Sequence, residues 1–545
     1  MFEKRIRDYK GYGMIMAVCF LALLAIQRLY FGLRYFPVLD DWFLYYGNSL
    51  QENQWSDVIL KNQLLAQRPL ACLTDSYLIG ACLPHLWIPY LITLCMLGGG
   101  LLLLSRGLDK SRIYTGGFLL TMMALFPFHI EATNWLSASS RICTALFFIG
   151  LSVFLLDRYL EKCSKVFLIL YFICGFFCVS YYETALPVYI LVNAFAVSRE
   201  REGLAGRLPL LLIPVGWCMA MAAYYALSPF GGEVAARGAQ VRENYGEHFS
   251  FVISELKNTG RYILPLCGGS LRRGVRLMWE NHSYVRLVLA VLLSGAFSWA
   301  YMRYAERKGF SWKEAARTAV AGVLLVIGGL AIIFVLAYVR LSFRVLFFAF
   351  LGVGLLMDAG IRWLAQYRIG RVLGGIFTGV TVFAMTAAGI GEIDFYRLTN
   401  WRDMQLVDRM TESDKVEKML EGDQEIYLFG AEEYYFPDCQ NRFEHVRSTA
   451  SMYAAFSGAI YYRIGQPLPG NIYAYYNGQE INQWLRQNRE HCAVYCIEND
   501  GSLSEGAMLQ DSDGSSNLTV IRKDGTIFGT LEYFSEDQYL FWQNE

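Results

Sequence analysis

The fold class follows from the apolar run Met14-Ile-Met-Ala-Val-Cys-Phe-Leu-Ala-Leu-Leu-Ala-Ile-Gln-Arg-Leu-Tyr-Phe31, which is soon followed by Phe36-Pro-Val-Leu-Asp-Asp-Trp-Phe43. The first run is long and apolar enough to span a membrane, and no small-residue cleavage site follows it, so we expect a retained anchor. The second stretch lies at the polar exit of that span and carries two adjacent acids, Asp40 and Asp41. A solvated loop at a helix end would explain the dipeptide alone, but further polar residues are predicted on the same side of the membrane.

Apolar runs of this kind recur through about the first 390 residues, as in polytopic helical membrane proteins. The chain is too apolar for an ordinary soluble protein, since 55% of its 545 residues are hydrophobic, 15% are aromatic and only 18% are charged. We therefore expect a polytopic α-helical membrane domain over residues 1–391. A hydropathy window of about 19 residues predicts eleven spans, near residues 13–31, 86–104, 113–128, 142–157, 166–180, 185–198, 208–227, 287–304, 318–338, 344–361 and 372–391.

Cations gather in every second connection between these spans, and this pattern predicts the orientation. They precede the first span and follow the second, fourth, sixth, eighth and tenth spans, with Lys4, Arg106, Arg158, Arg199 and Arg303 as examples. The positive-inside rule assigns such segments to the cytoplasm. We therefore expect a cytoplasmic N-terminus and an extracytoplasmic C-terminal domain.

Four segments are then predicted to lie outside: residues 34–85, the turn around Phe128–Trp135, the turn Tyr181–Thr184 and the long loop 228–286. The first segment carries acids and an arginine, and the last carries many arginines. Carboxylates and cations at the outer leaflet suit an anionic lipid headgroup, because arginines bind its phosphate and an acid is left for chemistry.

The composition changes after Ile393 to a polar chain of about 150 residues, itself the size of a domain. We expect an extracytoplasmic α/β domain over residues 392–545. Its patterns predict strands at Glu425–Gly430, Cys492–Ile497 and Leu518–Arg522 and helices around Asp414–Glu421 and Gln479–Gln487. Its many tyrosines suit either core and membrane-interface packing or a platform for sugar rings. The 13 cysteines form no evident disulfide framework, which favours a bacterial plasma membrane.

Short motifs follow one another in order on the predicted outer side. They are Asp40-Asp41-Trp42 with Asn48, Arg68-Pro69-Leu70, Pro84-His85, Phe126-Pro-Phe-His129 with Glu131-Ala132, Asn134-Trp135 and Arg141, Tyr182-Glu183-Thr184-Ala185 with Pro187, Arg261-Tyr-Ile-Leu-Pro265, and Arg344 with Gly352. Over residues 36–355 this order resembles the GT-C glycosyltransferases, polytopic enzymes that use a polyprenyl-phosphate sugar donor. The nearest likeness is to the membrane region of protein O-mannosyltransferase-like proteins, including those with tetratricopeptide repeats.

The chain departs from this family at three points. The family's arginine–x–aspartate element is Arg141-Ile-Cys143 here, so an acid is missing. The lysine of its lysine–glutamate–threonine–alanine turn is replaced by Tyr182. No tetratricopeptide repeats follow, so the resemblance does not extend to the C-terminal domain.

The resemblance implies that an acid of the first external loop takes the proton of the acceptor hydroxyl. We expect Asp41 to be this general base, with Asp40 beside it. Departure of the donor phosphate needs cations, and Arg68, Arg141 and Arg344 are the candidates because guanidinium binds phosphate bidentately. For each arginine, snorkelling to lipid headgroups is the alternative.

Further candidates lie in the short external turns and would contact the acceptor or support the site. They are Glu131, Asn134, Trp135, Glu183 and His129. Either glutamate also suits a solvated turn, and a hydrogen-bonded loop histidine explains His129 better than a metal ligand does. The metal content stays open: the adjacent aspartates suit Mg²⁺ or Mn²⁺, but no third acid is fixed nearby by spacing. No cofactor is assigned.

The expected function is an inverting hexosyltransferase of the cell envelope. It would transfer a sugar from a polyprenyl-phosphate donor to a glycan, lipid or protein acceptor on the outer face, with the membrane and no nucleic acid as partner. A transporter or flippase of a polar lipid or solute is the main alternative, although ionisable residues at mid-span and inverted repeats are not evident. An O-antigen polymerase or ligase and a sensory membrane protein are further alternatives.

Overall fold

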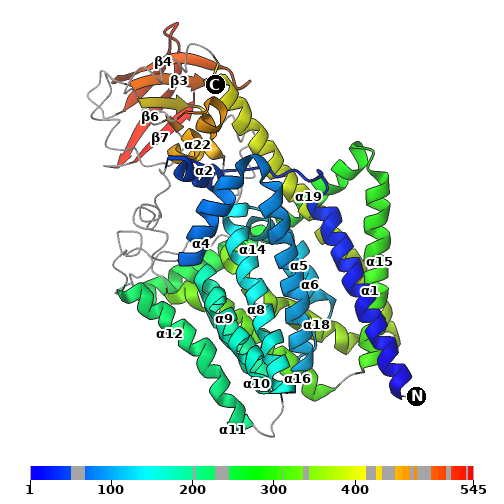
Figure 1. Cartoon of the computed structure of the whole chain (residues 1–545). Coiled ribbons are helices and arrows are strands. Elements are labelled where there is room, and N and C mark those ends of the chain that lie inside the picture. The colour runs from blue at the N-terminus through cyan, green and yellow to red at the C-terminus, as the bar shows by residue number, and fades with distance from the viewer. Residues whose placement is uncertain are drawn as a thin grey trace. The chain divides into compact units, whose positions relative to one another are not determined.

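The computed structural model describes residues 2–50, 68–199, 204–227, 245–309, 311–335, 343–412, 425–431, 448–466, 472–474, 492–510, 517–535 and 538–543 (Figure 1). The chain divides into two compact units. Unit 1 comprises Met1–Tyr35, Gln54–Asp75 and His85–Asp394, and unit 2 comprises Phe36–Asn53, Ser76–Pro84 and Phe395–Glu545. Unit 1 is helical in its described part, whereas the strands all belong to unit 2.

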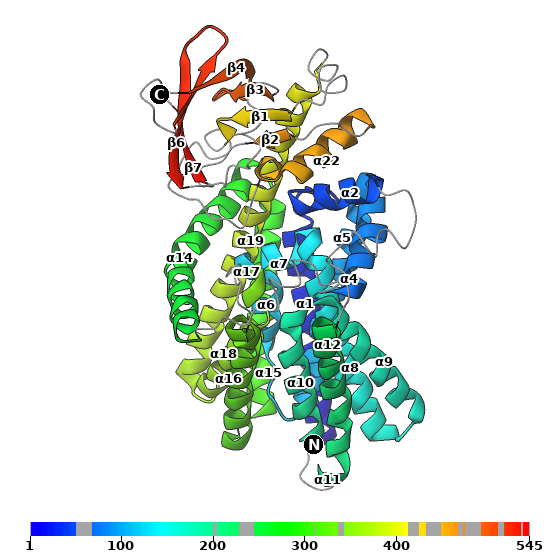
Figure 2. The same ribbon diagram turned by 90° about the vertical axis from the view of Figure 1, so that its left-hand side faces the viewer.

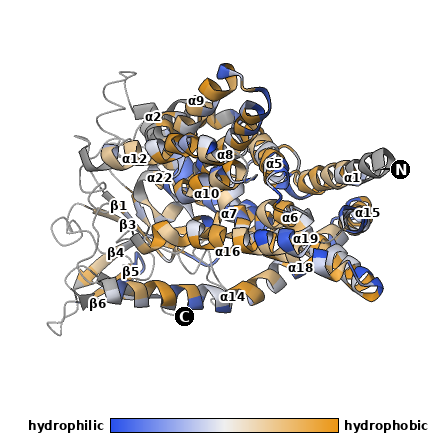
Figure 3. Ribbon diagram, turned by 90° about the horizontal axis from the view of Figure 1, so that it is seen from below, coloured by the Kyte–Doolittle hydropathy of each residue, from blue (hydrophilic) through white to orange (hydrophobic). Residues whose placement is uncertain are grey.

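Unit 1 has the helices of an integral membrane protein. In the described part of the chain, seven segments are long and apolar enough to cross a membrane: Gly11–Arg28, Trp87–Lys110, Leu136–Lys162, Leu204–Tyr224, Tyr284–Lys308, Trp312–Phe334 and Arg368–Met410. They correspond to helices α1 (Phe2–Arg28), α5 (Trp87–Lys110), α8 (Leu136–Lys162), α11 (Leu204–Arg207) with η6 (Leu208–Leu211) and α12 (Leu212–Leu227), α15 (Tyr284–Lys308), α16 (Trp312–Val335) and α19 (Arg368–Met410). Figure 3 shows hydrophobic residues along most of these helices. The predicted class of a polytopic helical membrane protein is therefore confirmed.

The predicted number of eleven spans is wrong. Four of the predicted spans fall on shorter helices: α6 (Gly117–Leu125), α9 (Lys165–Tyr181), α10 (Leu186–Val197) and α18 (Ala349–Leu364). The nine residues of α6 rise only about 13.5 Å, against a hydrocarbon core about 30 Å thick. Extended backbone at Gly116 and Phe126 bounds this helix. A hydropathy window misses such ends because it averages over apolar residues whether or not they are helical.

Two close helix contacts depend on glycine. A Cβ at Gly100 on α5 would lie 2.7 Å from Cα of Phe147 on α8. A Cβ at Gly274 would lie 1.8 Å from the carbonyl oxygen of Ala387 on α19. Small residues allow the backbones of membrane helices to approach in this way, so larger side chains at either position would push the helices apart.

Gly274 belongs to α14 (Tyr245–Glu280), a helix of 36 residues. It occupies much of the segment 228–286, which the sequence predicted as an external loop, so most of this connection is helical. The apolar and the charged residues of α14 lie on different faces of the helix. A search for fully apolar spans does not detect such an amphipathic helix. Figure 2 shows α14 as a long helix that passes α19.

Shorter helices connect the long ones at the end of unit 1 where α8 begins. They are α4 (Pro69–Thr74), η4 (Pro127–His129), α7 (Ile130–Thr133), η5 (Glu183–Ala185) and α17 (Phe343–Leu346). Of η2 (Asp75–Ile79), only Asp75 belongs to unit 1. η4 and α7 contain the motif around Phe128–Trp135, and η5 contains the turn after Tyr182. The motifs singled out in the sequence therefore lie on short helical turns.

Unit 2 is strand-rich in its described part. Its sheet has the order β2-β1-β3-β4-β5-β6-β7, parallel from β2 to β3 and antiparallel from β3 to β7. The strands are β1 (Glu425–Phe429), β2 (Ile472–Ala474), β3 (Cys492–Ile497), β4 (Leu503–Gln510), β5 (Leu518–Arg522), β6 (Ile527–Ser535) and β7 (Gln538–Gln543). The three predicted strands are confirmed as β1, β3 and β5. The helices predicted around 414–421 and 479–487 lie outside the described residues.

Two helices of unit 2 pack together, α2 (Asp40–Leu50) and α22 (Tyr453–Ile464). The rings of Trp42 and Tyr462 lie 5.5 Å apart between them. The core of the sheet contains aromatic residues, with Phe429, Phe528 and Phe541 all buried. Large aromatic rings bury much apolar area each, so they stabilise a core of this size.

Candidate active site

Three arginine–carboxylate pairs lie in unit 1, on or next to its short helices and in the first turns of α8, and we refer to them as the three-pair cluster. The members are Arg68 with Glu183, Arg141 with Asp75, and Arg344 with Glu131. All three arginines are those that the sequence predicted as phosphate ligands. The structure shows that each of them has a carboxylate beside it.

The first pair joins the segment before α4 to the turn between α9 and α10. Nε of Arg68 donates to Oε2 of Glu183 at 2.6 Å, and its Nη2 donates to Oε1. The same guanidinium lies 4.9 Å from the ring centre of Tyr182. Burial alone would raise the pKa of Glu183, but the charge and hydrogen bonds of Arg68 outweigh burial and hold this pKa below its ordinary value. Glu183 is therefore an anion that fixes the arginine in place.

The second pair joins the start of η2 to the first turns of α8. Nε of Arg141 donates to Oδ2 of Asp75 at 2.7 Å, and Nη2 donates to the same oxygen. Ser140 donates to Oδ1 of Asp75 at 3.0 Å. Burial raises the pKa of Asp75, while Arg141 and Ser140 act in the opposite direction.

The sequence analysis did not predict Asp75. It noted only that the family's arginine–x–aspartate element has Cys143 in place of the acid. The structure pairs Arg141 with Asp75, which lies 66 residues away in the sequence. The available signal was an acid within the otherwise mostly apolar stretch Pro69–Pro84. Because acids are seldom buried without a partner, this position deserved to be paired with an arginine.

The third pair joins α17 to α7 and is the loosest. The backbone N–H of Arg344 donates to Oε2 of Glu131 at 3.2 Å, whereas Nε lies 3.6 Å from Oε1. The guanidinium lies 4.9 Å from the ring centre of Trp135. The Arg344 side chain is 35% exposed and that of Glu131 only 4%. Arg344 is therefore the most accessible arginine of the cluster.

Electrostatic interactions join two of the pairs, Arg68 with Glu183 and Arg344 with Glu131, at Tyr182, which is buried between α9 and η5. Burial is the largest influence and raises the pKa of the Tyr182 hydroxyl. The charges of Glu183 and Glu131 raise this pKa further, whereas those of Arg68 and Arg344 lower it. Two further interactions cross between pairs, since Arg68 acts on Asp75 and Arg141 acts on Glu183. The pairs therefore form one charge-balanced cluster.

Asn134 and Trp135 lie next to the cluster, where α7 ends and α8 begins. Oδ1 of Asn134 accepts a hydrogen bond from the hydroxyl of Tyr90 at 2.9 Å. The buried Arg28 of α1 donates to the carbonyl of Ala124 at 3.0 Å and to the hydroxyl of Thr133. The sequence analysis missed Arg28 because it lies inside the first apolar run. These bonds hold the segment that carries Glu131 and Trp135.

His129 is buried among aromatic rings, and its Nδ1 lies 3.2 Å from the carbonyl oxygen of Met123. The rings of Phe347 and Phe350 lie 4.9 and 4.8 Å from its own. Burial lowers the pKa of His129 to about 3, so the imidazole is neutral at ordinary pH. These contacts agree with the hydrogen-bonded histidine that the sequence preferred over a metal ligand.

Asp40 and Asp41 belong to unit 2, whereas the three-pair cluster belongs to unit 1. They form the first turn of α2, and Oδ2 of the buried Asp41 accepts a hydrogen bond from the backbone N–H of Val38 at 3.1 Å. Asp40 is half-buried. Leu39 has a positive φ of 41°, and its N–H donates to the hydroxyl of Thr449 at 3.2 Å. One oxygen of Asp41 therefore caps the start of α2, as expected for an acid in a first helical turn.

No group of three or more metal-ligating side chains occurs among the described residues. Mg²⁺ is usually held by one or two carboxylates together with substrate phosphates, so a donor phosphate would supply part of its ligands.

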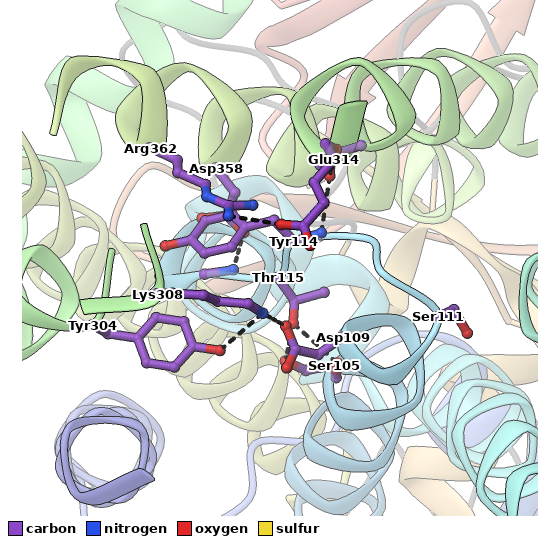
Figure 4. A network of polar contacts seen from close by, with 12 residues as sticks. Ser105, Asp109, Ser111, Tyr114, Thr115, Tyr304, Lys308, Glu314, Asp358 and Arg362 are labelled. Carbon is purple, nitrogen blue, oxygen red and sulfur yellow. Dashed lines mark hydrogen bonds and ion pairs between the residues drawn. The ribbon is translucent and has the colours of Figure 1, made fainter. Parts of the chain in front are cut away.

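A second polar network lies at the other end of the helices, where α18 ends and α6 begins (Figure 4). The buried carboxylate of Asp358 accepts the backbone N–H groups of Gly116, Phe118 and Leu119 at 2.7, 2.9 and 3.2 Å. The hydroxyl of Tyr301 donates to it at 2.7 Å. Asp358 thus satisfies the unpaired N–H groups at the start of α6, so its role is structural.

Two ion pairs flank the buried ring of Tyr114 in the same network. Arg362 pairs with Glu314 at 2.7 Å and lies 4.5 Å from the ring centre. Lys308 pairs with Asp109 and lies 5.3 Å from the ring centre. These contacts join the ends of α5, α15, α16 and α18.

Comparison of the chain with protein-family models and with curated proteins finds no match. The resemblance to GT-C glycosyltransferases therefore rests on the motifs themselves.

Proposed function

We propose that this protein is a membrane glycosyltransferase that transfers a sugar from a polyprenyl-phosphate donor to a glycan, lipid or protein acceptor on the outer face of the membrane. The observation that carries the proposal is the three-pair cluster. It gathers three arginines and three acids at one end of a helical membrane unit, where a lipid-linked phosphate would be recognised.

The paired carboxylates give the arginines fixed orientations before the donor binds. Arg141 uses Nε and Nη2 for Asp75, which leaves its Nη1 group for another acceptor. Arg344 makes the longest ion pair of the three and has the most exposed side chain. We assign the donor phosphate to these two arginines first, with Arg68 as the supporting cation. Oriented donors of this kind stabilise the charge that develops on a departing phosphate.

The proton of the acceptor hydroxyl needs a base, and the acids of the three-pair cluster are poor candidates because each already pairs with an arginine. Asp41, with Asp40 beside it, stays our candidate. The hydrogen bond from Val38 orients the carboxylate of Asp41 through Oδ2. An oriented carboxylate is what general-base catalysis requires. The inverting outcome, the GT-C class of the membrane unit and the cytoplasmic N-terminus belong to the same proposal.

The test is sugar transfer by purified protein in liposomes. A panel of radiolabelled polyprenyl-phosphate sugars would serve as donors, and membranes of the source cell would supply the acceptor. We expect label to move from one donor to the acceptor with the wild type, and the Asp41→Asn variant to lose at least a hundredfold in rate. Asp40→Asn is the matched variant at the neighbouring position.

Each result has a defined meaning. Full transfer by both aspartate variants would show that neither Asp40 nor Asp41 is the general base, while the proposed glycosyltransferase activity would stand. Binding of a donor that is moved across the liposome membrane without cleavage would replace the proposal by a transporter. No binding and no transfer with any donor would reject it.

A further inference from the structure

A groove runs between α15 and the first half of α19, within unit 1. Its volume is about 810 Å³. Along most of its length the lining is apolar, and side chains such as Val291, Ile376 and Val380 are exposed. Exposed apolar residues on a membrane-spanning helix face lipid chains.

Small residues give the groove its depth. Ser294, Gly295 and Ser298 line it from α15, and Gly375 and Gly379 line it from α19. The hydroxyl of Ser298 donates to the carbonyl oxygen of Gly375, so the two helices are tied together at the floor. A Cβ placed on Gly295 would meet no atom within 4 Å. The groove therefore has room for a flexible acyl chain, and it is closed at its floor by the contact between the two helices.

One end of the groove is charged. Arg303 and Glu306 lie near the C-terminal end of α15, and Arg368 and Arg371 lie at the N-terminal end of α19. Glu306 pairs with both Arg303 and Arg371. In the described part of the chain the exposed side chain of Arg368 makes no ion pair or hydrogen bond. Three arginines against one glutamate give this end a net positive charge.

The length of the groove matches one leaflet. The lining residues extend over 16 positions, or 15 helical steps, on each helix, from Val291 to Glu306 and from Arg368 to Phe383. At 1.5 Å per residue this is about 22 Å, close to the roughly 20 Å of one leaflet with its headgroups. The charged end of the groove thus lies at the depth of the lipid headgroups when its apolar part lies among the acyl chains.

We propose that this groove is a binding site for an anionic phospholipid of the bilayer. Its phosphate contacts Arg303 and Arg368, its acyl chains lie along the apolar lining, and Glu306 keeps Arg371 oriented. Charge complementarity selects an anionic headgroup over a zwitterionic one, because each arginine near the surface adds about 1 kcal/mol for an anionic lipid. The positive-inside orientation puts this end in the inner leaflet. The site is separate from the three-pair cluster and depends only on membrane insertion.

The test is native mass spectrometry of the full-length protein, purified and exchanged into nanodiscs of equal phosphatidylglycerol and phosphatidylcholine. We expect bound phosphatidylglycerol to exceed phosphatidylcholine in the wild type. The preference falls about fivefold for each arginine removed, so Arg303→Gln and Arg368→Gln together abolish it. Arg307→Gln, on the same helix end but outside the groove, is the control and keeps the preference.

A steric variant separates the groove from general surface charge. Gly295→Leu adds a Cβ that meets no atom within 4 Å, so its side chain extends into the groove, and we expect it to lower the amount of both bound lipids. Gly216→Leu on α12 is the matched control, since a Cβ there also meets no atom within 4 Å, and it leaves both amounts unchanged. Equal binding of the two lipids by the wild type, or no effect of either groove variant, overturns the proposal. Displacement of phosphatidylglycerol by an equimolar polyprenyl phosphate overturns it in favour of the donor as occupant.

Discussion

At the scale of single residues, the carboxylates of the three-pair cluster explain why its arginines can be partly buried. Asp75 is 1% exposed and Arg141 14% exposed, and each satisfies the charge of the other. Removing one partner of such a pair leaves an uncompensated buried charge, which costs far more than an exposed pair contributes. Asp75 is therefore a structural residue of the cluster as well as an orienting one.

Asp75→Asn should destabilise the protein by about 3–5 kcal/mol, measured as a lower midpoint of thermal unfolding in detergent. Glu280→Gln is the control, because Glu280 is 63% exposed and pairs with Arg276 over 3.7 Å. That variant should change the free energy of unfolding by less than about 0.5 kcal/mol. The double variant Asp75→Asn with Arg141→Gln should recover part of the loss. A midpoint for Asp75→Asn equal to that of the control would show that the buried pair is not formed.

The pair of Glu183 with Arg68 predicts a dependence of stability on pH. The pKa of Glu183 is lower in the folded protein than the ordinary value of 4.5. The stabilisation is therefore fully present above about pH 4.5 and is lost as the pH falls through the lower, folded pKa. The unfolding midpoint of the wild type should exceed that of Glu183→Gln by a constant amount from pH 7 to 5, and this difference should shrink below pH 4.5. A difference that stays the same down to pH 3 would contradict the assignment.

At the scale of elements, α6 exists because a distant side chain caps it. Its sequence is apolar throughout, and its first N–H groups have no partner of their own within the helix. Asp358 of α18 supplies one carboxylate for three of them. The sequence predicted a span over 113–128 here, since hydropathy does not reveal that the chain is extended before Gly117 and after Leu125.

Asp358→Ala should expose the start of α6 without unfolding the other helices. We expect faster hydrogen–deuterium exchange at the amides of Gly116, Phe118 and Leu119, with the remainder of α6 less affected. The variant Asp109→Ala, which removes a partner of Lys308 in the same network, is the control and should leave those amides protected. Unchanged exchange in Asp358→Ala would mean that other groups cap the helix.

At the scale of the whole molecule, the sequence predicted the membrane class and three strands of unit 2 correctly. Those signals are local: long apolar runs for spans, and short β-branched or aromatic runs for strands. What it missed depends on contacts between distant segments, such as Asp75 with Arg141, or on helix ends that lie within apolar sequence. Arg28 was hidden for the same reason, since its partners Ala124 and Thr133 lie about a hundred residues away.

The candidate site was predicted in part. Arg68, Arg141, Arg344, Glu131 and Glu183 come together in unit 1 as the order of motifs suggested, although their mutual pairing could not be derived from spacing. Asp40 and Asp41 lie in the first turn of α2 in unit 2. Their adjacency in sequence indicated a polar exit from the first span but not that Asp41 caps a helix.

The most direct measurement of the central claim compares sugar transfer by Arg344→Gln and Arg276→Gln at donor concentrations below saturation. Arg344 lies in the three-pair cluster, whereas Arg276 is an exposed arginine of α14. A lost charge-assisted hydrogen bond to phosphate costs about 1.5–3 kcal/mol, so Arg344→Gln should transfer at least tenfold more slowly while Arg276→Gln matches the wild type. Equal transfer rates for the two variants would contradict the assignment of the donor phosphate to this cluster.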